Sequence, residues 1–346
     1  MSLRSQRMHE ILPCAAHILV DFACTALLTA SCVGSGAVSV IFCAVVYNGC
    51  AFAMQLPIGL LADRFGLRRG AACAGCLAVA LGSLLTPPLL LCVVVGLGNA
   101  CFHVGAGRDA LLHGGSRAAR VGRFVAPGAF GIFLGPLAAE VFWLTRCAAP
   151  LLLSVCAVLL FAQAQEAPPA AKPLSLQAPR RVALAISMFL TVLLRSYMGT
   201  VTRYAELSIP VFAVAMTVCI FVGKFLGGSL ADRFGAFRFQ LTAQLIGTAL
   251  FALSVPFPLL GLPAALLFNT TMAVTVHTLF RSAPPHAGAM FGLTTLALYL
   301  GALPRLLGAP NPLFTPWGLA LIGGVSALTL LLGLYIAQKG GGADDR

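Results

Sequence analysis

A six-residue sequence that occurs twice constrains this chain more than any other feature. Leu-Ala-Asp-Arg-Phe-Gly fills residues 61–66 and recurs at 230–235. The offset between the two aspartates is 232 − 63 = 169 residues, close to half of the 346 residues. A repeat at half-chain spacing, placed between long apolar runs, indicates two related halves. We expect the carboxylate and guanidinium of each copy to bond the ends of neighbouring helices, and the glycines to permit a tight reversal.

The apolar runs are of membrane-spanning length. Hydrophobic residues make up 59% of the chain and charged residues 9%, whereas soluble domains have about 25% charged residues. A spanning helix needs about 20 residues, so twelve of them leave no room for a soluble domain. The sequence therefore predicts an all-α polytopic membrane protein, whose first apolar run is a retained helix rather than a signal peptide.

The positions of these runs predict two bundles of six helices each. The twelve expected helices lie at residues 11–30, 36–60, 70–86, 88–105, 121–143, 147–163, 181–202, 208–230, 237–255, 257–279, 285–307 and 314–337. A stretch rich in Pro and Ala at 164–180 is the expected linker. The predicted domains are an N-terminal bundle at 1–163 and a C-terminal bundle at 181–346, joined by this cytoplasmic linker.

The net charge of +12 follows the predicted topology. Most of the 22 Lys and Arg fall in the even-numbered loops and the two tails, and basic residues on one side of a membrane set orientation. We expect both termini to be cytoplasmic, in the inner or plasma membrane of the cell. The expected surroundings are the lipid bilayer, with a monomeric protein and no nucleic-acid partner.

The repeated sequence also carries a family resemblance. Gly-x-Leu-Ala-Asp-Arg-x-Gly followed by basic residues resembles the loop signature of the major facilitator superfamily, which lies between helices 2 and 3 with a weaker copy between helices 8 and 9. The resemblance implies two pseudo-symmetric six-helix bundles around a central cavity, working by alternating access. It also implies a role in conformational gating for Gly59, Asp63, Arg64, Gly66 and Arg68, and for Asp232 and Arg233 in the second copy.

A second signature lies in the expected fifth helix. Gly122, Gly131, Gly135 and Pro136 have the spacing of the antiporter motif of facilitator-type exporters, although its closing Gly-Gly is replaced by Ala-Glu at 139–140. Small residues at i and i+4 let two helix backbones approach closely, and proline bends a helix. The resemblance implies antiport and a gating role for Gly131, Gly135 and Pro136; the alternative is plain helix packing.

Ionisable residues inside apolar runs are candidates for proton coupling. His17 and Asp21 lie one helical turn apart on one face, and such a pair can exchange a proton near neutral pH. Intramembrane carboxylates usually mark an ion or proton path, although a hydrogen bond that locks helix packing is the alternative. Glu140, expected deep in the fifth helix, is a third candidate for proton coupling.

Polar residues on the second and fourth helices are candidates for substrate binding. Asn99 and His103 lie one turn apart on the fourth helix, and Asn48 and Gln55 interrupt the apolar second helix. Residues 96–103, with the His-x-x-x-Asp of the first helix, are similar to the branch of the superfamily that includes fosmidomycin-resistance exporters. Two positions depart from that pattern: Val104 replaces a proline, and Cys92 occupies the place of an arginine common in facilitators.

The second half contributes cations. Arg195 and Lys224 fall within the seventh and eighth helices, where an unpaired charge is unfavourable, so each should face the cavity or a partner. The planar fork of Arg195 suits a carboxylate or phosphonate. Lys224 could equally form an ion pair, for which Glu140 is the expected partner.

These features favour a proton-coupled antiporter that exports a small organic solute, with an anion among the options. No cofactor and no resident metal ion are expected. One alternative is metal-ion efflux, since Cys14 and Cys101 accompany His17, Asp21 and His103 on the first and fourth helices, and these residue types suit divalent metals. Another class is an intramembrane enzyme that uses the His/Asp pair for acid–base work. Against an enzyme, no hydrolase, zinc-protease or phosphate-loop motif occurs.

Overall fold

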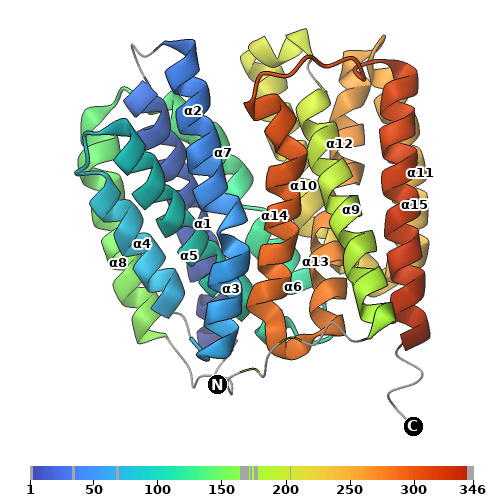
Figure 1. Ribbon diagram of the computed structural model, residues 1–346, viewed down its shortest axis with the longest axis horizontal. Helices are drawn as coiled ribbons and strands as arrows, with labels where there is room; N and C mark the ends of the chain where they lie inside the picture. The colour runs from blue at the N-terminus through green and yellow to red at the C-terminus, as the bar shows by residue number, and fades with distance from the viewer. Residues whose placement is uncertain are drawn as a thin grey trace. The chain divides into compact units, whose positions relative to one another are not determined.

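The structure is helical throughout the residues that it describes. A computed structural model describes residues 3–32, 36–67, 70–163, 171, 174, 178–202 and 204–340, and these contain no strand. The α-helices are α1 (Leu3–Cys32), α2 (Ala37–Asn48), α3 (Gln55–Arg64), α4 (Gly70–Gly82), α5 (Pro88–Gly114), α6 (Ala119–Val125), α7 (Gly128–Leu137), α8 (Ala149–Ala162), α9 (Pro179–Val201), α10 (Pro210–Phe234), α11 (Ala236–Ser254), α12 (Gly261–Asn269), α13 (Thr271–Ser282), α14 (Ala287–Leu306) and α15 (Pro316–Gly340) (Figure 1). Short π-helical turns at Gly49–Ala53 and Leu144–Ala148 connect α2 to α3 and lead into α8.

The membrane-spanning pattern agrees with the predicted twelve helices. Within the described residues, ten helices are long and apolar enough to cross a membrane. The two remaining predictions correspond to the shorter helix α4 and to the pair α6 and α7. The chain is therefore a multi-pass membrane protein with an all-α fold.

Among the predicted helices, the fifth differs most from what the structure contains. Instead of one helix over 121–143, α6 ends at Val125 and α7 begins at Gly128. Pro127 lies at this break, and proline has no N–H for the hydrogen bond that a continuous helix needs. Further along, α7 ends at Leu137, so Glu140 lies in an exposed turn rather than deep in a helix. The prediction of its position was wrong.

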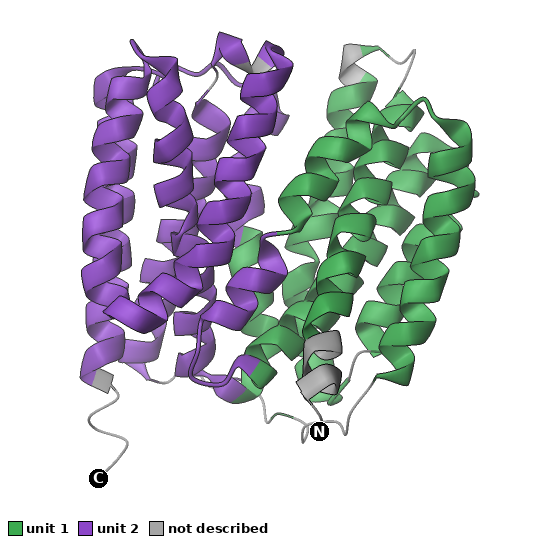
Figure 2. Cartoon of the chain, turned by 180° about the vertical axis from the view of Figure 1, so that it is seen from behind, with its two compact units in different colours: residues 1–113, 127–173, 285–296 green, residues 114–126, 174–284, 297–346 purple. Residues whose placement is uncertain are grey.

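By their contacts the residues form two compact units (Figure 2). Unit 1 comprises residues 1–113, 127–173 and 285–296, and unit 2 comprises 114–126, 174–284 and 297–346. Each unit thus contains a short segment from the other sequence half: 285–296 in unit 1 and 114–126 in unit 2. The proposed domain boundaries, which follow the sequence halves, stay a prediction.

In unit 1, glycines bring α7 against α1. A Cβ at Gly131 would collide with the carbonyl oxygen of Ile18 and with the Asp21 side chain, and one at Gly135 would overlap Thr25. Small residues at these positions are therefore required by the close backbone approach. α4 packs on α8, which also contacts α1, and His17 and Asp21 of α1 are buried.

Unit 2 repeats this close approach with different residues. A Cβ at Gly301 of α14 would meet the carbonyl oxygen of Leu193 and the Cβ of Ser196 on α9. The glycine again faces a carbonyl oxygen and a side chain three residues later, so Ser196 occupies the place that Asp21 has in unit 1. Elsewhere in unit 2, α9 and α11 pack on α15, and α10 and α11 pack on α12. Phe251, Phe268 and Leu319 belong to the hydrophobic core there.

Candidate functional site

A buried polar cluster joins α1 to α5 inside unit 1. His17 and Asp21 of α1 form an ion pair with 3.2 Å between Nε2 and Oδ2. Asn99 of α5 donates a hydrogen bond from Nδ2 to Oδ1 of Asp21 at 3.0 Å. His103 Nε2 lies 3.6 Å from the same oxygen and 2.8 Å from Nε2 of His17. All four residues are at least nine-tenths buried. The structure therefore brings together two pairs of residues that were predicted on separate helices.

The geometry of the two imidazoles limits where their protons can lie. His103 Nδ1 faces the carbonyl oxygen of Asn99 at 2.9 Å, and a carbonyl only accepts hydrogen bonds, so this nitrogen carries a hydrogen. The contact of 2.8 Å between the two Nε2 atoms requires one proton, because two N–H groups or two lone pairs would repel at that distance. The histidines therefore share a proton beside the Asp21 carboxylate.

Gly128, at the start of α7, lies against the same cluster, whose residues come from α1 and α5. A Cβ at Gly128 would overlap Oδ2 of Asp21 and Nε2 of His17. The absence of a side chain lets backbone approach the two titratable groups, which are thereby enclosed by α1, α5 and α7. A glycine outside the antiporter spacing is thus part of the site, and sequence reasoning missed it.

His17, Asp21 and His103 were also candidate ligands of a metal ion. One ligand atom from each of His17, Asp21 and His103 lies within 4.8 Å of the others, and among the described residues this group contains neither Cys14 nor Cys101. Two imidazole ligands of a tetrahedral ion lie about 3.3 Å apart, given metal–nitrogen bonds of about 2.0–2.1 Å. The observed 2.8 Å is a hydrogen-bond distance, and we do not assign these residues as metal ligands.

The first copy of the repeated sequence binds the start of α14 within unit 1. Asp63 accepts hydrogen bonds from the backbone N–H groups of Gly288, at 3.0 Å, and Ala289, at 2.8 Å. A carboxylate at a helix N-terminus satisfies free N–H groups and complements the helix dipole. Arg108 adds a hydrogen bond from Nε to Oδ1 at 2.8 Å, and Asp63 is only 1% exposed. Gly59 provides the space, because a Cβ there would collide with Gly288.

The second copy repeats the arrangement within unit 2. Asp232 accepts hydrogen bonds from the N–H groups of Ala118 and Ala119, both at 2.9 Å, at the start of α6. Gly228 packs against Ala118 as Gly59 packs against Gly288. Unlike Asp63, Asp232 is exposed. The local function that the repeat predicted, a carboxylate bound to a neighbouring helix end, is present in both copies.

Arginine and glycine within the repeat have separate tasks. Arg64 and Arg233 lie over the rings of the phenylalanines that follow them, 6.0 and 5.4 Å from the ring centres. Gly66 and Gly235 adopt φ angles of +59° and +83°, a backbone conformation that favours glycine. Arg68 lies outside the described residues. The partner of Asp63 is instead Arg108, which was assigned to a loop because the fourth helix was expected to end at residue 105 rather than at Gly114.

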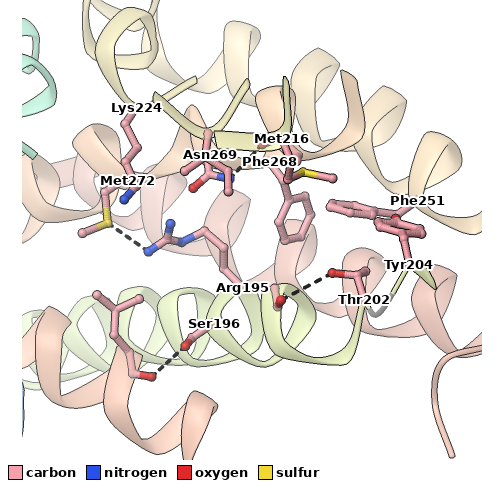
Figure 3. A pocket seen from close by; sticks show the side chains of 14 residues that line it. Arg195, Ser196, Thr202, Tyr204, Met216, Lys224, Phe251, Phe268, Asn269 and Met272 are labelled. Carbon is pink, nitrogen blue, oxygen red and sulfur yellow. Dashed lines mark hydrogen bonds between the residues drawn. The ribbon is translucent and has the colours of Figure 1, made fainter. Parts of the chain in front are cut away.

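A cavity of about 380 Å³ lies in unit 2, between α9, α10 and the break between α12 and α13. Arg195 and Lys224 both line it, and they point toward one another beside Met272 (Figure 3). The remaining lining residues are mostly apolar or aromatic, together with a few hydroxyl or amide groups; they are Ser196, Gly199, Thr202, Tyr204, Met216, Ile220, Phe251, Ala265, Phe268, Asn269 and Leu298. No acidic residue lines the described cavity.

The predicted residues of the second helix are not among the residues that line this cavity. Asn48 donates a hydrogen bond to the carbonyl of Ala44 at 2.8 Å, within its own helix. Gln55 is fully buried in unit 1, where its Nε2 donates to the carbonyl of Ala51 at 2.6 Å. Both side chains flank the π-helical turn at Gly49–Ala53. Their role in substrate binding stays a prediction.

Comparison with solved structures identifies the fold. The chain is similar to a bacterial homologue of the iron transporter ferroportin in an outward-facing state (TM-score 0.63, 15% identity, 96% of this chain and 99% of that chain). It is also similar to the human organic anion transporter MFSD10 (TM-score 0.62, 14% identity, 96% and 99%). A further match is the E. coli fucose:proton symporter FucP (TM-score 0.61, 14% identity, 95% of this chain and 97% of that chain). No family model matches the chain, and no curated protein does.

These likenesses extend over almost the whole chain and define its architecture. The chain has the fold of major facilitator superfamily transporters, as the repeated loop signature predicted. At 14–15% identity they show the fold and not the cargo. The similarity to the branch of fosmidomycin-resistance exporters stays a prediction from the sequence.

Proposed function

We propose that this protein is a proton-coupled secondary transporter of a small organic solute and that the histidine pair with Asp21 is its proton site. The observation that carries the proposal is the 2.8 Å contact between Nε2 of His17 and Nε2 of His103, beside a buried carboxylate. A site that holds one shared proton and accepts a second can link proton binding to a change of conformation. The transporter fold and the proton-coupled symporter among its structural neighbours support the proposal.

Within this proposal the chain works as an antiporter that exports its cargo. The glycine spacing of the fifth predicted helix, which resembles the antiporter motif, supports this direction. The protein acts as a monomer in the inner or plasma membrane, with both termini and the 164–180 linker in the cytoplasm, and it performs no chemical conversion. The two halves, 1–163 and 181–346, alternate access to the cargo, and Glu140 is the reserve candidate for proton coupling.

Proteoliposomes that contain a pH-sensitive dye test the coupling. We test a panel of organic acids, amines and neutral drugs. We expect at least one of them to cause protons to cross the membrane of vesicles that contain the purified protein. Asp21→Asn and His103→Gln should abolish this movement, because each removes a member of the shared-proton site. Glu206→Gln, an acid outside both the cluster and the cavity, is the matched control. Solute-dependent proton movement that persists in both cluster variants would contradict the proposal.

Metal-ion transport is the second candidate, because His17, Asp21 and His103 are residue types that bind divalent metals and offer ligand atoms within 4.8 Å of one another. Metal binding would require the two imidazoles to move apart from their 2.8 Å hydrogen bond. The similarity to a ferroportin homologue is one of fold and adds no substrate information. The same vesicles, loaded with a metal-sensitive dye and exposed to Fe²⁺ or Co²⁺, separate the candidates. Metal uptake that depends on His17 and His103, without solute-dependent proton movement, would replace the proposed function by this one.

A further inference from the structure

Arg195 is a buried cation whose hydrogen-bonding capacity is largely unused. Its side chain on α9 is 7% exposed. One terminal nitrogen donates to the Sδ atom of Met272 at 2.9 Å, and its buried Nε has no hydrogen-bond partner among the described residues. A guanidinium has five N–H donors, and a thioether is only a weak acceptor. Leaving charged donors unsatisfied in a buried place is costly, so this arrangement suits an acceptor that arrives from outside.

The charges around Arg195 indicate that the acceptor for its N–H groups is negatively charged. Lys224 lines the same cavity and extends toward Arg195 (Figure 3). Two cations that converge repel each other in a medium of low dielectric constant. None of the residues that line the described cavity is acidic. An anion would reduce this repulsion and satisfy the Arg195 donors.

The walls of the cavity define the rest of the ligand. Away from the two cations, Phe251 and Phe268 pack edge to face with ring centres 5.2 Å apart, and Met216 and Ile220 continue this apolar surface. Tyr204 has its hydroxyl bound to Ser254 at 2.7 Å, so it presents mainly its ring. Pockets of this kind, apolar with a few convergent polar groups, bury the body of a ligand and orient it by the polar end. The volume of about 380 Å³ suits a small molecule.

We infer that this cavity binds an amphipathic organic acid, with its oxyanion on Arg195 and Lys224 and its apolar or aromatic body against Phe251 and Phe268. The inference rests on the proposed transport function for its physiological meaning, and it names the substrate class. Arg195 takes the carboxylate through its planar fork. Met272 is the group that yields, because a flexible thioether gives up a weak hydrogen bond when a carboxylate oxygen replaces it.

Three probes of nearly equal shape test the inference on the purified full chain in nanodiscs: 3-phenylpropionate, 3-phenylpropionamide and 3-phenylpropylamine. Calorimetry without any pH gradient should show the acid binding about ten- to a hundredfold more tightly than the neutral amide, as expected for charge-assisted hydrogen bonds. The amine should bind more weakly than the amide. Succinate, which lacks an apolar body, should bind more weakly than 3-phenylpropionate.

Substitutions at the cavity assign the preference to its residues. Arg195→Gln should remove most of the preference for the acid over the amide, with the remainder due to Lys224, and leave amide binding unchanged. Arg195→Lys should retain part of the preference. The matched control is Arg180→Gln, since Arg180 lies on the same helix but is exposed and donates to the carbonyl of Ile336. If Arg195→Gln does not fold, the inference is still tested by Arg195→Lys and by the comparison of acid and amide binding to the wild-type protein.

Two results would overturn the inference. One is the absence of any preference for the acid in the wild-type protein, including the case in which none of the probes binds. The other is an equal loss of acid and amide binding in Arg195→Gln. If the acid shows no preferential binding but solute-dependent proton movement is observed, only the inferred substrate class is wrong. If the acid binds preferentially but no proton movement is observed, only the proposed transport mechanism is wrong.

Discussion

At the scale of single residues, the shared proton makes His17 and His103 interdependent. Each imidazole nitrogen in the 2.8 Å contact needs the other to carry or to accept the proton. Asp21 then serves as the counter-charge for the pair, with one oxygen held by Asn99. The proposed proton site therefore consists of His17, His103 and Asp21.

The variant Asp21→Asn tests this division of labour. Asparagine has nearly the same shape and keeps a side-chain oxygen toward Asn99, but it provides no negative charge beside the histidine pair. We expect pH-driven flux to vanish while binding of 3-phenylpropionate to the unit 2 cavity persists. Flux in vesicles and calorimetry in nanodiscs measure the two effects. Full pH-driven flux in this variant would make Glu140 the next candidate.

Gly128 provides a second test at the same site. A methyl group in Gly128→Ala would collide with Asp21 and His17, and overpacking of this kind costs about 1–3 kcal/mol. We expect a lower unfolding temperature in nanodiscs, together with impaired proton movement. Gly324→Ala is the matched control, because a Cβ at Gly324 of α15 meets nothing within 4 Å. That control should be neutral or stabilising, since alanine favours a helix.

The sequence could predict pairs within a helix but not the meeting of helices. Spacing of four residues put His17 beside Asp21, and Asn99 beside His103, because such residues share a helical face. Which face of α5 meets α1 depends on packing partners, and no local pattern specifies these. Gly128 and Met272 are part of the candidate sites through contacts distant in sequence, and their residue types carry no chemical signal.

At the scale of elements, the two carboxylates of the repeat each bind the start of a helix, but one carboxylate is buried and the other is exposed. Asp63 binds α14 and pairs with Arg108, and both of these side chains are buried. Asp232 binds α6 from an exposed position. The sequence predicted the equivalence of the two copies, because it depends on local spacing. It could not predict the difference, because Arg108 joins from a helix that continues beyond its expected end.

This difference predicts unequal effects of one substitution. Asp63→Asn leaves Arg108 without its buried carboxylate, and breaking a buried ion pair costs about 3–5 kcal/mol. Asp232→Asn removes an exposed carboxylate from a helix start, worth at most about 1 kcal/mol. We expect a clear fall in unfolding temperature and in solute flux for the first variant and a small change for the second. Equal effects of the two variants would show that Arg108 does not strengthen the first contact.

At the scale of the whole molecule, the predicted orientation is open to direct measurement. The distribution of basic residues predicts that both termini and the 164–180 linker face the cytoplasm. Single cysteines placed at residues 170 and 343 of a cysteine-free variant should react with a membrane-impermeant reagent only after the cells are opened. A cysteine at residue 310, in the connection before α15, should react in intact cells. A C-terminal cysteine that reacts from outside would contradict the twelve-helix topology.

The exposure of Asp232 has a consequence for the response to ionic strength. Mobile ions screen exposed charges over about 8 Å at physiological salt and about 3 Å at 1 M salt, but they reach buried pairs far less. Added salt should therefore weaken the attraction of Asp232 for the start of α6 and leave that of Asp63 for α14 almost unchanged. Two copies of one sequence, identical over six residues, would then differ in whether the surrounding electrolyte can loosen them.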